Sequence, residues 1–430
     1  MKMCILMTLA VAMGVHAKGE PLLCVPDVGT VFSDYQNKSF TISNDVLGVN
    51  NLYSQCSNMS DQQIIAVLDG CGPLEHPING LGLSPQDQFL YGLMPTDGMG
   101  IGTHVSFDVF PFPSPGKPGD MMKADPVDVY RIGNDGGYLR IGAVMPPDED
   151  SPLPADTEQV IPLVHSASTF NQAGDMFVLG YKTNYQSSAN VAAGTGQVLY
   201  QTPKIMIGQI DSASLTAANG AIIPATWSEV DTSSDAVCDA VMNQFRDRTN
   251  AFSACVVADY IANGNVDNAV QNCLANTAVL DFGIHDFAVS PSNGHFYALD
   301  TMSFDDTDVL IDVNANTMQA SCTNYADVGN ATGVMTSLMF SQQNKLVAVF
   351  ANENTGRWID VDTGVITTLA DNISPFPFGD GGSIPFVNPK RSVSSFSGTG
   401  DLIFRTGFEG DLIFKDGFGD FIVIPGCPAF

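Results

Sequence analysis

Positive charge is what this sequence has least of. Its 430 residues include 17 Lys and Arg against 46 Asp and Glu, which gives a formal net charge of -29 at pH 7. Nucleic acids and anionic membrane surfaces are bound through clustered Lys and Arg, so this composition argues against both as partners. Hydrophobic residues make up 44% of the chain. Because an acidic disordered protein lacks such an apolar fraction, we expect the chain to fold.

Signatures of known catalytic machinery are also lacking. The sequence contains no G-x-S-x-G nucleophile turn, no H-E-x-x-H zinc motif and no G-x-x-x-x-G-K-[ST] phosphate loop. Its two tryptophans, Trp227 and Trp358, are too few for an aromatic carbohydrate platform. The motifs therefore assign no reaction to the chain.

Residues 1–17 read as a signal peptide, and no long apolar run follows them. Lys2 supplies the positive region, an apolar stretch follows, and small residues precede a cut after Ala17. A buried N-terminal helix is the alternative. No later segment reaches the ~18 apolar residues that span a bilayer, so we expect no membrane span.

The cysteine count agrees with export. Nine cysteines minus Cys4 of the signal leave an even set: Cys24, Cys56, Cys71, Cys238, Cys255, Cys273, Cys322 and Cys427. Even sets in exported proteins are typical of disulfides, and no C-x-x-C zinc or redox pattern occurs. We expect Cys56 to pair with Cys71. The three cysteines in segment 238–273 are expected to share two bridges with Cys322, which leaves the remaining two as a pair by exclusion.

An internal repeat gives the strongest prediction of architecture. Four segments align without gaps: Leu83–Leu93, Phe170–Gly180, Val289–Leu299 and Phe340–Phe350. Each reads as the end of a strand, a polar turn and an apolar second strand, and a third and a fourth short strand follow downstream. The unit is therefore a four-stranded antiparallel meander. Repeated meanders bury their faces by radial stacking, which predicts a β-propeller.

The repeat residues also carry a resemblance. The Ser-Pro…Phe-Tyr-Ala-Leu…Leu-Ile-Asp-Val pattern, within residues 78–370, resembles the blades of bacterial secreted propeller-like proteins of unknown function, related to YVTN and NHL-type repeats. The resemblance implies a mainly β fold with five to seven four-stranded blades. Residues 22–70 and 384–394 could supply another blade and the strand that closes the ring. A two-sheet β-sandwich is the structural alternative.

Residues 229–277 change from a strand period to a helical period. Val237 and Val241 share one helical face, Phe252 and Val256 share another, and Gly264 is expected to stop the second helix. We therefore predict a small disulfide-stapled helical insert within a propeller domain of residues 18–395. The insert is either a cap that binds a partner or a decorative loop.

Residues 396–430 are expected to form a linker and a repetitive tail. Gly400–Glu409 is followed at once by a near copy, Gly410–Gly419. The copies are similar to the short Ile-Phe-x-(Asp/Ser)-Gly-Phe-Glu element that ends many secreted proteins of Gram-negative bacteria. This resemblance implies a secreted, periplasmic or cell-surface location in a Gram-negative bacterium. The tail is either an export or sorting element or a β-hairpin, and the apolar residues that follow depart from the element's pattern.

Histidines and nearby acids supply the first candidate site. His165 and His285 precede equivalent innermost strands, an edge that faces the axial channel of a propeller. The candidates for a metal or small ligand in the channel are Glu75, His76, His165, His285 and Asp286. The alternative is a set of polar side chains at a solvated funnel.

Calcium is the second possibility, because hard cations take carboxylate and carbonyl oxygens. The candidate ligands are Asp305, Asp306, Asp308, Asp360, Asp362 and Asp380. None of them follows the EF-hand spacing, and the alternative is a set of solvated acidic turns. Calcium is therefore a possible cofactor.

Repeats that serve packing, without a catalytic motif, favour an exported, non-enzymatic propeller scaffold. Its partner would be a protein or a glycan at the cell surface, and the chain is expected to be a monomer. The alternative is a metal-dependent propeller hydrolase or lactonase-type enzyme with its site at the axial channel. A passive envelope component is a third reading, since a fold alone does not decide function.

Overall fold

The computed structural model describes the strands, the long helix and their tight connections. The described residues are 30–34, 39–42, 79–87, 89–95, 126–132, 138–148, 157–160, 163–187, 198–264, 268–269, 272–273, 284–300, 307–326, 334–340, 344–351, 355–371, 379–383, 402–405, 412–415 and 421–424. Statements about structure below concern these residues.

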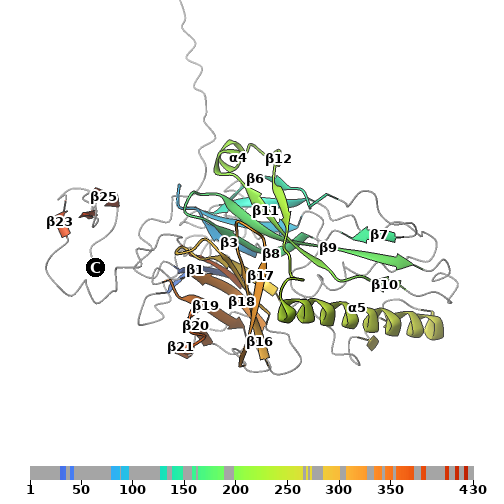
Figure 1. Cartoon of the computed structure of the whole chain (residues 1–430). Helices are drawn as coiled ribbons and strands as arrows, with labels where there is room; N and C mark the ends of the chain where they lie inside the picture. The colour runs from blue at the N-terminus through green and yellow to red at the C-terminus, as the bar shows by residue number, and fades with distance from the viewer. Residues whose placement is uncertain are drawn as a thin grey trace, which may run out of the picture.

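Four sheets make up most of the fold, and each contains an antiparallel meander of four strands (Figure 1). The first contains β3 (Asn79–Leu83), β4 (Leu90–Pro95), β5 (Val127–Ile132) and β6 (Tyr138–Val144). The second contains β8 (Leu163–Phe170), β9 (Met176–Ser187), β11 (Lys204–Ile210) and β13 (Thr226–Glu229). The third contains β14 (Ile284–Val289), β15 (Phe296–Asp300), β16 (Thr307–Val313) and β17 (Ala320–Ala326). The fourth contains β18 (Val334–Phe340), β19 (Leu346–Ala351), β20 (Thr355–Ile359) and β21 (Ile366–Asp371). These are the meanders that the repeat predicts, and we call them blades 1 to 4.

The first strands of the blades close into a ring. The strands β3, β8, β14 and β18 lie side by side in chain order, and β22 (Gly379–Ser383) lies between β18 and β3. β22 pairs with β1 (Thr30–Asp34), which pairs with β2 (Ser39–Ile42). This ring confirms the β-propeller arrangement and excludes the two-sheet sandwich. The strand that closes the ring, β22, lies just before residues 384–394, the segment that was expected to close it.

The expected count of five to seven four-stranded blades is not supported. Four sheets among the described residues have the blade topology, and the three-stranded sheet β2-β1-β22 occupies the gap between the fourth and the first. The repeat could not reveal this sheet, because its strands come from opposite ends of the chain and the glycines of β22 give no apolar pattern.

The hydrophobic core lies between neighbouring blades. One cluster joins blades 1 and 2, a second joins blade 2, blade 3 and the long helix, and a third joins blades 3 and 4. The contact between Tyr91 and Phe170 recurs two blades later between Tyr297 and Phe340, with ring centroids 5.4 Å apart in both cases. The boundary between blades 1 and 2 and the boundary between blades 3 and 4 therefore share this aromatic contact.

The helical insert is one continuous helix, α5 (Ala236–Asn263, 28 residues). The sequence predicts two separate helices here, and this prediction is wrong. The predicted stop at Gly264 is confirmed, because this residue caps the helix with a φ of 68°. The first half of α5 packs on the hydrophobic cluster of blades 2 and 3, whereas the second half does not. The buried residues of the two halves therefore lie on different faces of the helix. The disulfides Cys238–Cys322 and Cys255–Cys273 confirm the predicted pairing of this group. Cys24, Cys56, Cys71 and Cys427 lie outside the described residues.

Two additions extend blades 1 and 2. The strand β9 is 12 residues long, and its far end pairs with β7 (Thr157–Val160) and β10 (Val198–Tyr200). The helix α4 (Ser212–Ala217) leads to β12 (Ile222–Ile223), which joins the outer edge of β6 as a parallel strand. In Figure 1, α5 runs alongside the extension of β9.

The tail forms a small antiparallel sheet of β23 (Leu402–Arg405), β24 (Leu412–Lys415) and β25 (Phe421–Ile424). Each copy of the duplicated element supplies one strand, as a hairpin requires. A role of the tail in sorting stays a prediction. No helix among the described residues is both long and apolar enough to cross a membrane.

Candidate functional site

The two ends of the propeller differ in the connections that they carry. At the end that we call the turn end, the first and second strands of the blades are joined through 84–89, 171–175, 290–295 and 341–345. At the opposite end, the loop end, four long connections of blades 1 to 3 begin and finish: 96–126, 145–162, 188–203 and 230–283. The helix α5 and the extension of β9 therefore belong to the loop end.

The turns at the turn end are joined across the blades by hydrogen bonds. The Gln86 side-chain amide donates to the Ala173 carbonyl of blade 2 at 2.7 Å, and Gln172 donates to the Pro291 carbonyl of blade 3 at 2.8 Å. The Ser290 hydroxyl donates to the Asn344 side chain of blade 4 at 3.3 Å. These bonds fix the turns to one another, so this end is a rigid base and a poor place for an adaptable site.

At the loop end, every first strand breaks its register with the second strand. The breaks fall between Asn79 and Gly82, Leu163 and Ser168, Ile284 and Phe287, and Met335 and Ser337. Such irregularities re-aim side chains and are common beside functional sites. Their recurrence at one repeat position places a ring of irregular backbone at the loop end of the axis.

Three of the predicted channel residues, His165, His285 and Asp286, lie in first strands at this ring. His165 lies in β8 and His285 in β14, and these are neighbouring strands. Their side chains, together with Glu75 and His76, lie outside the described part. The backbone thus brings two of the candidates to adjacent strand starts, and the convergence of their side chains on a ligand stays a prediction.

Asp286 has a role that the sequence did not indicate. Its side chain is 1% exposed, and its carboxylate accepts hydrogen bonds from the backbone N–H of Phe287 at 2.8 Å and of Leu338 at 2.7 Å. Because Leu338 belongs to β18, the carboxylate joins the first strands of blades 3 and 4. This geometry describes a cross-link between blades, with both oxygens occupied by N–H donors.

The calcium candidates lie at opposite ends of the propeller. Asp308 is buried near the start of β16, at the loop end, whereas Asp360 and Asp362 lie in the β20–β21 turn at the turn end. Asp305 and Asp306 lie outside the described residues, as does the side chain of Asp380. The six candidates therefore cannot hold one ion together, and a calcium cofactor stays a prediction.

At the turn end, acidic residues organise the turns. Asp360 accepts hydrogen bonds from the backbone N–H of Asp362 at 3.2 Å and of Thr363 at 2.9 Å. Bonds from the Thr363 side chain and backbone hold the pKa of the Asp360 carboxyl below its usual value. This is the chemistry of an Asp turn, in which the carboxylate bonds backbone N–H groups two and three residues further on.

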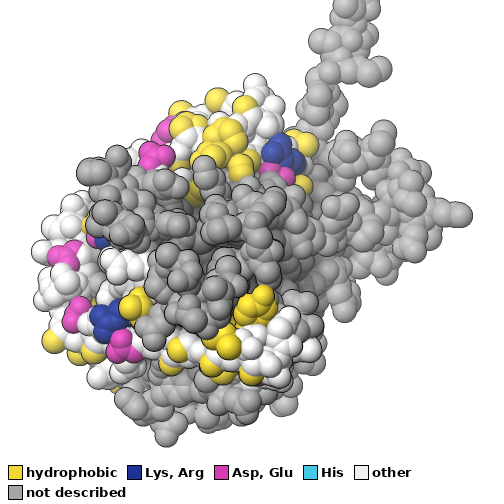
Figure 2. All heavy atoms as spheres, turned by 90° about the vertical axis from the view of Figure 1, so that its right-hand side faces the viewer, with side chains coloured by type: hydrophobic (Ala, Val, Ile, Leu, Met, Phe, Trp, Pro, Cys, Tyr) yellow, Lys and Arg dark blue, Asp and Glu magenta, His cyan; other side chains and the backbone are white. Residues whose placement is uncertain are grey.

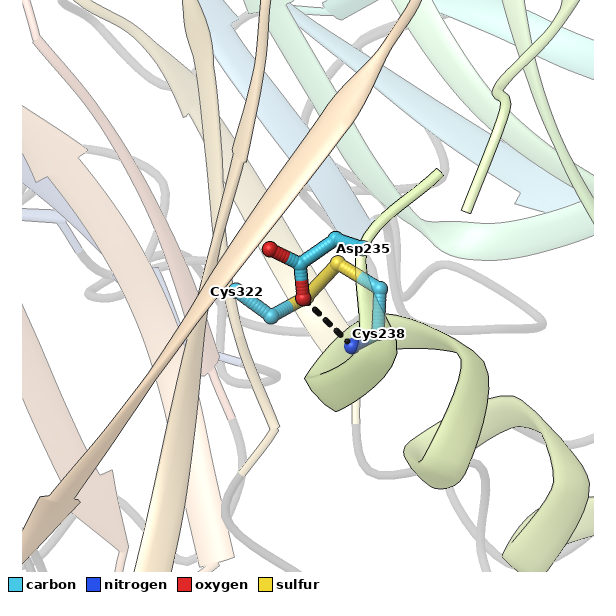
Figure 3. Close-up of side chains that lie close together, drawn as sticks. All are labelled: Asp235, Cys238 and Cys322. Atoms are coloured by element: carbon cyan, nitrogen blue, oxygen red, sulfur yellow. Dashed lines mark hydrogen bonds between the residues drawn. A yellow bond between two sulfur atoms is a disulfide. The ribbon is translucent and has the colours of Figure 1, made fainter. Parts of the chain in front are cut away.

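A different group brings potential metal ligands together. The carboxylate of Asp235 and the sulfurs of Cys238 and Cys322 lie within 4.8 Å of one another (Figure 3). In this structure the two sulfurs form a disulfide of 2.06 Å, so neither is a thiolate that could bind a metal. The oxidised group therefore does not fit a metal ion. The sequence marked both cysteines but missed Asp235, whose signal is an Asp at the start of a helical period.

Figure 2, which looks at the loop end, shows basic side chains beside acidic ones on the described surface. The ion pairs Arg140–Asp128, Lys204–Glu229 and Arg246–Asp247 measure 2.6, 2.8 and 2.7 Å. Positive charge among these residues is thus locally balanced.

Comparison with known proteins adds little to the topology. No protein-family model matches the chain, and no curated protein matches it. A putative gluconolactonase structure is 11% identical, with a TM-score of 0.33, and the match covers 95% of this chain and 88% of that one. Virginiamycin B lyase from Staphylococcus aureus is 9% identical, with a TM-score of 0.25 and coverages of 82% and 85%.

A DUF4784 family protein from Bacteroides caccae is 7% identical, with a TM-score of 0.32 and coverages of 83% and 74%. At these TM-scores and identities the likenesses carry no argument about this chain's chemistry. The assignment as a β-propeller rests instead on the ring of first strands and the four meanders.

Proposed function

We propose that the chain is an exported, non-enzymatic propeller scaffold that binds a protein or glycan at the cell surface through its loop end. One observation carries the proposal: four long connections of blades 1 to 3 begin and finish at one end of the ring, while at the other end the turns between first and second strands are joined by hydrogen bonds. In many binding proteins the binding surface is formed by loops that a rigid scaffold holds in place.

The helix α5 supports the same reading. Its start is fixed to blade 3 by the Cys238–Cys322 disulfide. Its middle is fixed to β10 by Asn250, whose side chain bonds both backbone groups of Tyr200 at 2.7 and 3.1 Å. A helix fixed at both these points is preorganised, so a partner would not have to order it on binding. In an exported scaffold the disulfides would supply this rigidity.

Two exposed apolar residues at opposite ends allow a matched test. Leu199, in β10 at the loop end, is 50% exposed, and Val365, in the β20–β21 turn at the turn end, is 55% exposed. We expect Leu199→Asp to weaken binding of the labelled protein (residues 18–430) to Gram-negative cells and to a glycan array. Val365→Asp should leave binding unchanged.

Equal effects of the two substitutions would contradict a loop-end surface. A purified protein that carried a stoichiometric metal and hydrolysed lactones, with both properties lost in His285→Ala, would instead establish the enzymatic alternative. Release of residues 1–17 during export, measured from the intact mass, tests the localisation separately.

A further inference from the structure

The group of Asp235, Cys238 and Cys322 joins two elements that are far apart in the sequence. Asp235 precedes the first turn of α5 and Cys238 lies in that turn, while Cys322 lies in β17 of blade 3 (Figure 3). Cys238 and Cys322 are 1% and 7% exposed, and Asp235 is partly exposed. The group therefore lies at the edge of the core, with its carboxylate toward solvent.

Asp235 uses only half of its carboxylate to cap the helix. Its Oδ1 atom accepts the backbone N–H of Val237 at 2.9 Å and of Cys238 at 3.1 Å. Both bonds fall on the same oxygen, so the capping leaves Oδ2 uncommitted. A carboxylate that is oriented through one oxygen presents the other in a fixed direction.

Contacts other than the disulfide also join the two elements that carry the cysteines. Cys238 packs in the cluster of blades 2 and 3 with Met242, while Cys322 pairs in register with Ile311 of β16. The backbone before α5 is also tied to β17, through the N–H of Ala320 and the carbonyl of Asp231 at 2.9 Å. The Cα atoms of the two cysteines, 5.2 Å apart, should therefore stay close after reduction.

Two thiolates and a carboxylate are a ligand set that suits zinc. Once the disulfide is reduced, the two sulfurs must move apart from their bonded distance of 2.06 Å. Zn–S bonds of about 2.3 Å and a Zn–O bond of about 2.0–2.2 Å would then join ligand atoms that come from one small group. Asp235-x-x-Cys238 also has the two-residue gap of many zinc ligand pairs. The fourth position would fall to water, because Asp235 borders solvent. The helix N-terminus opposes a cation but stabilises the thiolates that bind it.

We propose that reduction of the Cys238–Cys322 disulfide converts this group into a zinc site formed by Asp235, Cys238 and Cys322. A dithiol reductant supplies two electrons and two protons, the S–S bond breaks, and the dithiol itself becomes a disulfide. Zinc then replaces one proton on each thiol. The same three residues thus give an anchor for α5 in the oxidised chain and a metal centre in the reduced one.

The experiment uses the folded protein (residues 18–430), reduced with a phosphine that is then removed. Alkylation and peptide mapping identify the free thiols, and circular dichroism reports whether the fold persists. We expect cobalt(II), as a spectroscopic probe for zinc, to give thiolate charge-transfer absorption and one-to-one stoichiometry, and zinc to displace it. The oxidised protein should give neither signal.

Variants separate this site from other causes of binding. Asp235→Asn retains a helix cap but loses the anionic ligand, so zinc affinity should fall about tenfold or more, the scale on which zinc-site partners act. Cys255→Ser with Cys273→Ser removes the other disulfide and should leave binding unchanged. Cys238→Ser with Cys322→Ser should abolish it.

Three results would overturn the proposal. They are binding that survives in the Cys238→Ser and Cys322→Ser double variant, an unchanged affinity in Asp235→Asn, and a disulfide that is reduced only when the fold is lost. None of these outcomes bears on binding through Leu199, so this proposal and the scaffold function fail separately.

Discussion

The carboxylate of Asp286 accepts the backbone N–H of Leu338 at 2.7 Å, across the boundary between blades 3 and 4. The boundary between these two blades is mostly apolar packing, and a buried hydrogen bond between their first strands adds a directional contact to it. It also fixes the irregular backbone at the loop end of the axis.

Replacing Asp286 should weaken the whole fold. Asp286→Ala leaves the Leu338 N–H buried without this acceptor, which we expect to lower the free energy of unfolding by about 1–3 kcal/mol. Urea unfolding followed by fluorescence measures the change. Asp362→Ala, at an exposed turn, is the control and should stay within about 0.5 kcal/mol of the wild type. Similar losses in both variants would show that Asp286 does not cross-link the blades.

Gly142 allows β12 to join blade 1. A Cβ at this position would meet the Ala221 carbonyl and would lie 2.7 Å from Cγ1 of Ile223, so Gly142→Ala should displace β12. We expect faster hydrogen exchange at the Ala143 amide, which donates to Ala221 at 3.2 Å. Gly264→Ala is the control: its Cβ would meet nothing, and the left-handed backbone should cost about 1–2 kcal/mol without affecting Ala143.

Asn250 protects the edge of β10. Its Oδ1 accepts the Tyr200 N–H, and its Nδ2 donates to the Tyr200 carbonyl. We expect Asn250→Ala to cost about 0.5–1.5 kcal/mol and to speed hydrogen exchange at Tyr200. Asn250→Asp keeps an acceptor for the N–H, so exchange there should stay slow. Unchanged exchange in Asn250→Ala would mean that other contacts protect this edge.

Tyrosine ionisation should set the alkaline limit of stability. Burial raises the pKa of Tyr297 to about 12, against about 10 in an unfolded chain. Between these values the unfolded state loses the proton and the folded state keeps it. The stabilisation is therefore full below pH 10 and declines as the pH rises toward 12.

Burial also raises the pKa of Tyr91 and of Tyr181, which adds to this alkaline slope. Tyr297→Phe removes one titrating group but keeps the ring against Phe340, so the loss of stability above pH 10 should become shallower. Unfolding midpoints measured from neutral to alkaline pH test this. An unchanged slope would show that Tyr297 ionises normally in the folded protein.

The sequence predicted the elements whose signals are local. The repeats beginning at Leu83 and Val289 combine turn residues with apolar strands, so pairing between neighbouring strands followed directly. The helix was predicted in two pieces because its buried face changes between Val241 and Phe252, and the sequence does not show that two different bodies pack on one helix. The helix end at Gly264 was predicted correctly, because glycine is the preferred residue where a helix ends in the left-handed conformation.

Long-range contacts were harder to foresee. The bond from Asp286 to Leu338 depends on the packing of two blades, and no spacing in the sequence encodes it. Asp235 shows an intermediate case, since its capping role can be read from the start of α5, while its distance to Cys322 requires the fold. The sequence thus indicated which end of the propeller axis carries the candidate channel residues, but it did not indicate which of their side chains act together.

The pairing of β22 with β1 has a consequence for the order in which the molecule is completed. Residues 379–383 leave the ribosome long after residues 30–34, so four blades can form while the arc is still open between β18 and β3. During that interval β1 and β2 have no partner on one side, and the unclosed arc exposes strand surfaces that invite association. A chain that stops before residue 379 would lack the strand that lies between β18 and β3.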